Sequence, residues 1–337
     1  MSTRELDAAG FRDLRLRDAY GTCQTFLRHR NSATYPAASK LLPPGKRPYW
    51  DAVFAFTTYV DDLIDDPLRL PEARTARFDD FERMFFLLLK SDAPWREAPA
   101  DGQGRLPRQL SLAFLHTVRT WDITEESVRH FMATIRTDLH TTDYPLFADL
   151  HAYIYGVCAV GTQWGNALLE PHDDEAARRS SSMSLAVQLT DILLDLREDL
   201  AVGRLYLPVE DLRRFGLTRA DVEEAAEHGR LTGPLRELVR FEADRARDYF
   251  DDAADWWRLA HPCTRELPRL YVQLGREALE SISRADYDVF RPARAGRLRG
   301  AARAGGASAL AYARSLRLRA AARGRPTTVQ PAPVGPY

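Results

Sequence analysis

The chain has 337 residues, of which 45% are hydrophobic and 28% charged, the balance of a soluble globular protein. No run approaches the roughly 18 apolar residues of a membrane-spanning helix, and the charged N-terminus argues against a signal peptide. The three cysteines (Cys23, Cys158 and Cys263) lack the spacing of metal ligands. We therefore expect a cytoplasmic protein with reduced thiols.

The net charge of −1 conceals an uneven distribution of charge. Segment 291–337 contains ten arginines and no acidic residue, so the rest of the chain is strongly acidic. A basic tail of this kind can contact nucleic acid, anionic lipid or the acidic body of its own chain. Tyr312 is the only aromatic residue among the arginines, so we expect no nucleic-acid partner. Weak membrane association remains an alternative to docking on the body and to disorder.

Helical patterns recur along the chain, whereas the alternating patterns of strands are scarce. Apolar residues repeat at intervals of three to four in four long segments, namely 78–90, 110–121, 127–139 and 235–257. These patterns predict amphipathic helices and an all-α fold.

Two breaks interrupt the helical pattern. Segment 91–107 is rich in Pro, Gly and Asp, which predicts a surface loop. In segment 203–216 the helix must end before Pro208. Because no linker or internal repeat occurs, we predict one all-α domain over residues 1–300. A basic helix and a disordered tail are expected over 301–337.

The predicted helix at 49–67 ends in a cluster of aspartates that includes Asp61, Asp62 and Asp65. Asp61 and Asp65 are four residues apart and therefore share one helical face. Like charges at this spacing repel by roughly 0.2–0.5 kcal/mol, unless a cation lies between them. Carboxylate oxygens suit Mg²⁺, which commonly bridges to substrate phosphates. A solvated helix end is the alternative for this segment taken alone.

A second acidic stripe lies in segment 183–208. Asp191, Asp195 and Asp199 follow one another at steps of four, with Glu198 beside them. Asp191 and Asp195 interrupt an otherwise apolar run. Burial of an unpaired carboxylate there would cost on the order of several kcal/mol, so both need a partner, a ligand or a proton. Two acidic stripes on separate helices of a bundle can face each other across a cavity. We therefore predict two carboxylate walls that hold metal ions and a diphosphate between them.

At this point the sequence resembles the squalene/phytoene synthase family, over roughly residues 20 to 295. Five segments carry the resemblance in the family's order: 33–56, 61–65, 131–156, 188–216 and 279–290. The fourth is the most specific, because it joins the second Asp-rich motif to the turn GRLYLP.

The resemblance implies a single-domain isoprenoid synthase fold, a helical bundle around a central cavity, with Mg²⁺ as cofactor. The implied catalytic residues are Asp61, Asp65, Asp191, Asp195 and Asp199. The implied metal ligands are Asp61, Asp62, Asp65, Asp195, Glu198 and Asp199. The residues implied at the diphosphate end are Gln188, Arg204 and Tyr206, with Lys40 as a further cation. An allylic carbocation also needs a dry, π-rich wall, for which Tyr59, Tyr153 and Trp164 are candidates, and core packing is the alternative role of each.

The chain departs from the family at three positions where arginines are usual. These positions hold Thr58, Leu194 and Ala33 instead, while Arg204 and Lys40 remain. Each charged hydrogen bond to a diphosphate contributes about 1.5–3 kcal/mol, so these replacements should weaken the binding of a second diphosphate.

We therefore favour a prenyltransferase that ionises one allylic prenyl diphosphate and passes the prenyl group to an apolar acceptor. An electron-rich aromatic ring of a natural-product pathway would fit, and no NADPH would be needed. The alternatives are a head-to-head synthase that makes phytoene or squalene from two prenyl diphosphates, and a terpene cyclase or hydroxylating enzyme. A non-catalytic scaffold is disfavoured because both acidic pairs are intact.

Overall fold

The computed structural model describes residues 3–30, 39–66, 68–92, 94, 104–290 and 294–322, with the side chains of 294–306 left aside. Ala33 and the expected tail beyond residue 322 therefore lie outside the described residues. The helices of the N-terminal half are α1 (Thr3–Ala8), α2 (Leu14–Arg30), η1 (Pro44–Lys46), α4 (Arg47–Asp65), α5 (Pro71–Leu89), α6 (Arg105–Thr120), α7 (Glu125–Ile135), η4 (Arg136–Leu139), α8 (Phe147–Ile154), η5 (Tyr155–Ala159) and α9 (Val160–Leu168). Those of the C-terminal half are α10 (Glu175–Leu194), α11 (Leu196–Ala201), α12 (Val209–Arg214), α13 (Arg219–His228), α14 (Gly233–Ala253), α15 (Trp256–Leu259), α16 (Glu266–Arg284) and α17 (Arg294–Ala322).

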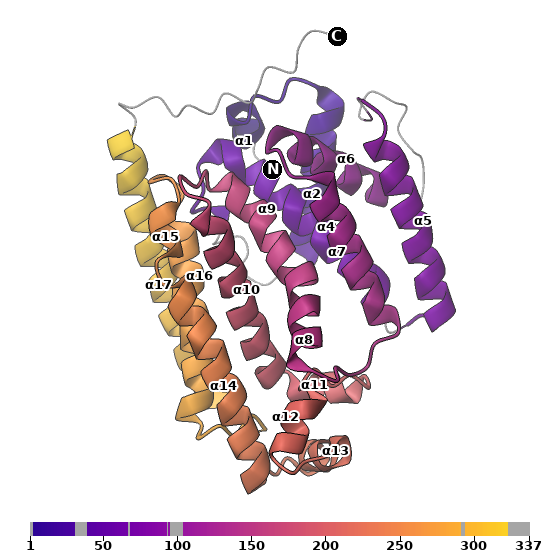
Figure 1. Cartoon of the computed structure of the whole chain (residues 1–337). Coiled ribbons are helices and arrows are strands. Elements are labelled where there is room, and N and C mark those ends of the chain that lie inside the picture. The colour runs from indigo at the N-terminus through magenta and orange to yellow at the C-terminus, as the bar shows by residue number, and fades with distance from the viewer. Residues whose placement is uncertain are drawn as a thin grey trace.

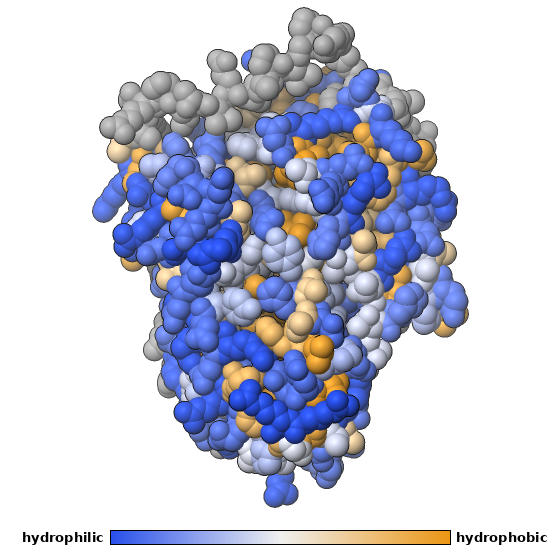
Figure 2. Space-filling model, viewed as in Figure 1, coloured by the Kyte–Doolittle hydropathy of each residue, from blue (hydrophilic) through white to orange (hydrophobic). Residues whose placement is uncertain are grey.

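These helices form one bundle, and no strand occurs in the described ranges (Figure 1). The prediction of an all-α, single-domain fold is confirmed. Helices α8, α9 and α10 lie at the front of the view, with α14, α16 and α17 on one side and α5 on the other. The face in view is mostly hydrophilic, and its hydrophobic residues form small separate patches (Figure 2). Within the described ranges, no helix is long and apolar enough to cross a membrane.

Helix α4 is fixed in place by an aromatic core. Phe56 is fully buried and stacks on Phe114 of α6, with 4.0 Å between ring centroids. Phe85 of α5 lies 4.9 Å from Phe56, and Trp164 of α9 packs against Phe114 at 5.1 Å. Buried aromatic rings are costly to displace, so this core orients the polar end of α4 that carries the first acidic pair.

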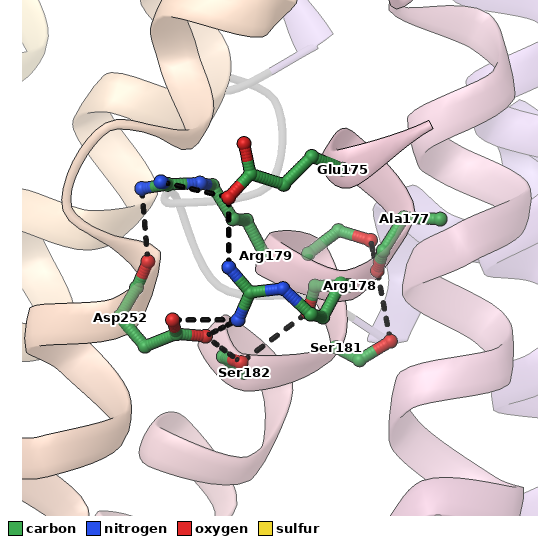
Figure 3. Close-up of polar contacts among 8 residues, drawn as sticks. Glu175, Ala177, Arg178, Arg179, Ser181, Ser182 and Asp252 are labelled. Carbon is green, nitrogen blue, oxygen red and sulfur yellow. Dashed lines mark hydrogen bonds and ion pairs between the residues drawn. The ribbon is translucent and has the colours of Figure 1, made fainter. Parts of the chain in front are cut away.

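Helix α10 packs along α14, and small residues allow their backbones to approach. Ser180 and Ala186 of α10, and Ala243 and Ala246 of α14, are completely buried. At its first turns α10 is also tied to the end of α14 by a polar network (Figure 3). In this network, Arg178 and Ser182 both donate to the carboxylate of Asp252, at 2.6 Å and 2.5 Å. This tether fixes the end of α10 opposite to its aspartates.

Gly275 of α16 lies where α10, α14 and α16 meet. A Cβ atom at this position would come within 2.6 Å of the buried Phe250 ring and 3.2 Å of Val187. We expect Gly275→Ala to lower the free energy of unfolding by about 1–3 kcal/mol through overpacking, measured by urea unfolding. The matched control is Gly21→Ala on α2, whose Cβ would meet no atom within 4 Å. The control should be neutral or stabilising, because alanine favours helices, and equal effects of both changes would contradict the prediction.

Outside the acidic segments, the predicted elements differ from the structure in three places. Pro107 lies inside the first turn of α6, where a proline is tolerated because its missing N–H has no helical partner. The helix predicted to reach residue 257 ends at Ala253, and the chain turns so that Trp256 is buried and donates to Asn166 at 2.8 Å. The expected domain boundary at residue 300 falls inside α17.

The Arg-rich helix α17 packs against α16. Arg314 donates to the buried carboxylate of Glu266 at 2.8 Å. Arg319 donates to the backbone carbonyls of Lys40 and Leu41, both at 2.8 Å. Ala311 and Ser315 of the same helix are buried. Helix α17 is thus docked on the body of the protein, one of the arrangements expected for the basic segment.

A buried acid pair joins α12 to α14. Arg245 donates to Asp211 at 2.9 Å and to Glu242 at 2.7 Å, and both carboxylates are almost fully buried. Burial raises the pKa of Glu242 to about 8, opposed by Arg245 and assisted by Asp211, while its ordinary value is 4.5. The folded protein therefore holds a proton on Glu242 over a range of pH in which the unfolded chain has lost it.

This raised pKa predicts a pH dependence of stability. Between pH 4.5 and about 8 the folded state binds more protons than the unfolded state, so the contribution of Glu242 to stability falls as the pH rises through that window. We expect Glu242→Gln, which cannot ionise, to gain stability relative to the wild type from pH 5 to pH 8. Melting curves measured across this range test the prediction, with Glu280→Gln on the exposed face of α16 as control. Parallel pH profiles of the wild type and Glu242→Gln would refute it.

Candidate active site

The first acidic wall is the end of α4. Asp61 and Asp65 lie one turn apart, and Asp62 adds a third carboxylate beside them. Solvent reaches Asp61, yet protein atoms surround it closely. Desolvation and the charge of Asp65 raise the pKa of Asp61 to about 7. These carboxylates repel one another, as expected of groups arranged around a cation rather than for stability.

The second acidic wall spans α10 and α11. Sequence periodicity predicted one continuous helix, but the helix breaks at Asp195, which has φ −101° and ψ 11°. The carboxylates stay close because Asp195 N–H still bonds to the Asp191 carbonyl at 2.8 Å, and Asp199 N–H to the Asp195 carbonyl at 2.9 Å. Desolvation and the charge of Asp195 raise the pKa of both Asp191 and Asp199 to about 6. Desolvation, and to a smaller extent the charge of Glu198, raises the pKa of Asp195.

The two walls come together at Arg204. Its guanidinium donates to the Asp65 carboxylate at 2.8 Å, and its backbone N–H donates to the Asp199 carbonyl at 2.9 Å. Arg204 lowers the pKa of Asp199 while Asp65 raises it, so the charges of both walls act on one another. Desolvation, the largest single effect, lowers the pKa of Arg204, but the hydrogen bond to Asp65 and the electrostatic effects of Tyr206, Asp65 and Asp138 together outweigh it, and the net shift is upward.

The turn that carries Arg204 and Tyr206 is held by the backbone. Leu205 N–H donates to the Thr142 carbonyl at 2.8 Å, and Val209 N–H donates to the Tyr144 carbonyl at 2.9 Å. The helix ends before Pro208, as the sequence predicted. Pairing with segment 142–145 therefore directs the arginine back toward the first acidic wall.

Asp138 is a residue of the site that sequence reasoning missed. The Tyr153 hydroxyl donates to the Asp138 carboxylate at 2.6 Å, and the Arg204 guanidinium donates to the Asp138 backbone carbonyl at 3.3 Å. Burial raises the pKa of Asp138 to about 6. The rings of Tyr153, Tyr144 and Tyr206 lie together, with 5.3–6.0 Å between centroids. The sequence did contain a signal for Asp138, because this acidic residue lies near the end of the helix predicted at 127–139 and within segment 131–156, which carries the family resemblance.

A π-helical turn, η5, separates α8 from α9. It brings Cys158 to α10, where the thiol donates to Gln188 at 3.3 Å. Burial, with the charges of Asp61 and Asp191 as further causes, raises the pKa of Cys158 to about 12, so the thiol stays protonated. Gln188 thus lies one turn before Asp191 and beside a neutral thiol, and π-helical turns are frequent at functional sites.

The remaining predicted residues are placed as follows. Tyr59 is half-buried on α4 and packs against Phe81, with 5.2 Å between centroids. Trp164 is buried in the aromatic core and donates to Ser127 at 2.9 Å. Lys40 is exposed, and its backbone carbonyl accepts hydrogen bonds from Arg47 and Arg319. In the described part of the chain, neither Trp164 nor Lys40 contacts the acidic walls.

The donor set fits a hard cation. Both walls offer carboxylate oxygens, which are the ligands that Mg²⁺ prefers. In the ranges described, no three acidic, histidine or cysteine side chains converge closely enough to hold a metal ion by themselves. Mg²⁺ commonly takes only one or two protein carboxylates and completes its shell with water and substrate phosphates, so two separated walls suit it.

Known proteins resemble this chain in sequence and in fold. Residues 28–303 match the squalene/phytoene synthase family. The 15-cis-phytoene synthase of Synechocystis sp. is 27% identical over 285 residues, covering 81% of this chain and 79% of the relative. Squalene synthase HpnC from Alicyclobacillus acidocaldarius aligns with a TM-score of 0.69 at 26% identity, over 83% of this chain and 98% of that chain. A dehydrosqualene synthase solved with a ligand has a TM-score of 0.70 at 21% identity, over 88% and 98%, which supports the fold alone.

A helical bundle with two opposed acidic walls defines an all-α isoprenoid synthase fold. The chain belongs to the squalene/phytoene synthase family. The family assignment made from sequence motifs is thereby confirmed.

Proposed function

We propose that this protein is a Mg²⁺-dependent prenyltransferase that ionises an allylic prenyl diphosphate between its two acidic walls. The observation that carries the proposal is the pairing of Arg204 with Asp65, which joins the second Asp-rich segment to the first. Asp61, Asp65, Asp195 and Asp199 would hold Mg²⁺, which neutralises the departing diphosphate when bound. Arg204 would release Asp65 to the metal and donate to the diphosphate oxygens, as a guanidinium does well.

The names of the relatives favour a second prenyl diphosphate as the acceptor. The Synechocystis relative is a 15-cis-phytoene synthase, and the Alicyclobacillus structure, at 26% identity, is a squalene synthase. Head-to-head condensation of two prenyl diphosphates is therefore the first candidate reaction. In this reaction the allylic cation is attacked by the double bond of the second substrate.

The composition of the site favours a second candidate, transfer to an acceptor without a diphosphate. Thr58 lies one turn before Asp61, and Leu194 lies directly before Asp195 with 39% of its surface exposed. Arginines are usual at both positions in the family. The positive charge of Arg204 lowers the pKa of Asp61, Asp138 and Asp199, against larger effects that raise each of them. A single guanidinium is better suited to binding one diphosphate group than to binding two diphosphate groups.

One incubation separates the two candidates. The enzyme is supplied with Mg²⁺ and farnesyl or geranylgeranyl diphosphate, with no other acceptor. Phytoene, presqualene diphosphate or squalene as product supports head-to-head condensation. Prenyl transfer that occurs only after an electron-rich aromatic compound is added supports the second candidate. Absence of diphosphate release under every condition would overturn the proposed prenyl transfer itself.

The variants Thr58→Arg and Leu194→Arg sharpen the comparison. If the missing arginines limit the binding of a second diphosphate, these variants should raise the yield of head-to-head product at least about tenfold, or 1.4 kcal/mol. Transfer to an aromatic acceptor should not rise with them.

A further inference from the structure

A pocket of about 400 Å³ lies where α15, the start of α16 and the C-terminal part of α17 meet. Four arginines line it: Arg265, which directly precedes α16, Arg269 of α16, and Arg314 and Arg317 of α17. In Figure 1, α15 and the end of α17 lie at the upper left, whereas α11 of the second acidic wall lies near the bottom. The surface over α15 is strongly hydrophilic in Figure 2. We call this feature the arginine pocket.

The arginine pocket has an excess of positive charge. Glu266 is the only acidic residue that lines it, and its side chain is just 4% exposed. Arg314 binds this carboxylate at 2.8 Å and Arg269 lies 3.8 Å from it, so one negative charge is shared by two guanidiniums. Within the described ranges, neither Arg265 nor Arg317 forms an ion pair with a carboxylate. Two guanidiniums thus face the pocket without an anionic partner.

The arrangement is held in place from both sides. Glu266 fixes Arg314 of α17 against α16, and the guanidinium of Arg269 lies 4.8 Å from the centre of the Trp257 ring. Leu318 adds an apolar surface beside the indole. Side chains held by an ion pair and by a ring lose little freedom when they bind a ligand, which favours binding.

We propose that the arginine pocket binds a phosphate-bearing anion. Guanidinium groups match phosphate oxygens with two parallel hydrogen bonds. Arg265, whose Nε donates to the Pro262 carbonyl at 3.4 Å, and Arg317 would donate them here through their remaining N–H groups. The apolar wall of Trp257 and Leu318 would accommodate an organic group attached to the phosphate. The anion can be free, such as phosphate or diphosphate, or it can be the headgroup of an anionic lipid.

The site is tested by comparing the binding of anions to the wild type and to the double variant Arg265→Gln/Arg317→Gln. Inorganic diphosphate is titrated into the protein, and tryptophan fluorescence is recorded. Mg²⁺ is left out, because without it the acidic walls repel diphosphate. The part of the fluorescence change that Trp257→Phe abolishes reports binding at the pocket. In parallel, vesicles of phosphatidylglycerol and of phosphatidylcholine are sedimented with the protein. The control is Arg12→Gln/Arg28→Gln, which removes two exposed arginines near the N-terminus. Circular dichroism establishes that each variant is folded.

We expect Arg265→Gln/Arg317→Gln to weaken the binding of diphosphate, the binding to phosphatidylglycerol vesicles, or both, by tenfold or more. The control Arg12→Gln/Arg28→Gln should change the same binding less than twofold. Loss of diphosphate binding assigns a free anion, and loss of binding to phosphatidylglycerol alone assigns a lipid headgroup. Equal losses in both double variants, or no binding in either arm, would overturn the proposal. Turnover with a soluble prenyl diphosphate should be unchanged by Arg265→Gln/Arg317→Gln, so a failure here is distinct from a failure of the proposed prenyl transfer.

Discussion

Asp61→Asn should abolish Mg²⁺-dependent turnover and leave the fold intact. Asp61 shares its helical face with Asp65, and the amide of asparagine offers a cation no negative charge. We expect kcat/KM for diphosphate release to fall at least about 100-fold, which corresponds to about 2.7 kcal/mol of transition-state stabilisation. Asp195→Asn should act in the same way from the opposite wall. A control is Asp80→Asn on α5, whose side chain is 73% exposed.

The stability of Asp61→Asn makes this prediction specific. The pKa of Asp61 rises from 3.8 to about 7 in the folded protein, so its contribution to stability falls as the pH increases through that window. Above pH 7 the folded protein carries the full cost of ionising this carboxyl, and asparagine removes that cost. The melting temperature at pH 8 without Mg²⁺ should therefore stay the same or rise. Full activity of the variant, or a large loss of stability, would contradict the model of two acidic walls.

Arg204→Gln should raise the KM for the prenyl diphosphate or lower kcat by at least tenfold, about 1.4 kcal/mol. Arg204 is the side chain that pairs with the first wall while its backbone is bonded to the second. Its removal leaves the charges of Asp61, Asp65, Asp138 and Asp199 without this opposing cation. The apo protein should therefore also melt at a lower temperature, and Mg²⁺ should restore part of the difference.

Arg219→Gln is the matched control for Arg204→Gln. Arg219 donates to the Gly203 carbonyl at 2.7 Å, so it supports the same turn, but its ion pairs run to Asp143 and Glu223. If the effect of Arg204→Gln came only from loosening the turn, both variants would have similar kinetics. A kinetic loss confined to Arg204→Gln assigns the effect to the guanidinium itself.

Long amphipathic segments were predictable because their apolar faces bury against the rest of the bundle whatever the topology. The pattern at 110–121 became α6, and the pattern at 127–139 became α7 and η4. The acidic pairs could also be proposed, because i and i+4 spacing places Asp61 beside Asp65 on any helix. Family motifs then added that the two acidic segments act together.

Features that depend on contacts between distant segments could not be predicted in this way. The bond from Tyr153 to Asp138 and the docking of Arg319 on Lys40 join residues that no local pattern relates. Sequence gives the type of a residue but not its direction, so Trp164, a plausible wall for a cation, lies in the aromatic core. The break at Asp195 could not be predicted either, because the steps of four from Asp191 to Asp199 fit an uninterrupted helix.

The docking of α17 has a consequence for how the protein is made. Arg319 holds the carbonyls of Lys40 and Leu41, directly ahead of the segment that leads into α4. Residue 319 leaves the ribosome after Lys40, Leu41 and all the helices from α4 to α16. The support of the first acidic helix therefore forms only after α17 has been made, so the earlier helices must remain soluble without it. Nascent chains that stall before α17 would expose this surface to chaperones and proteases.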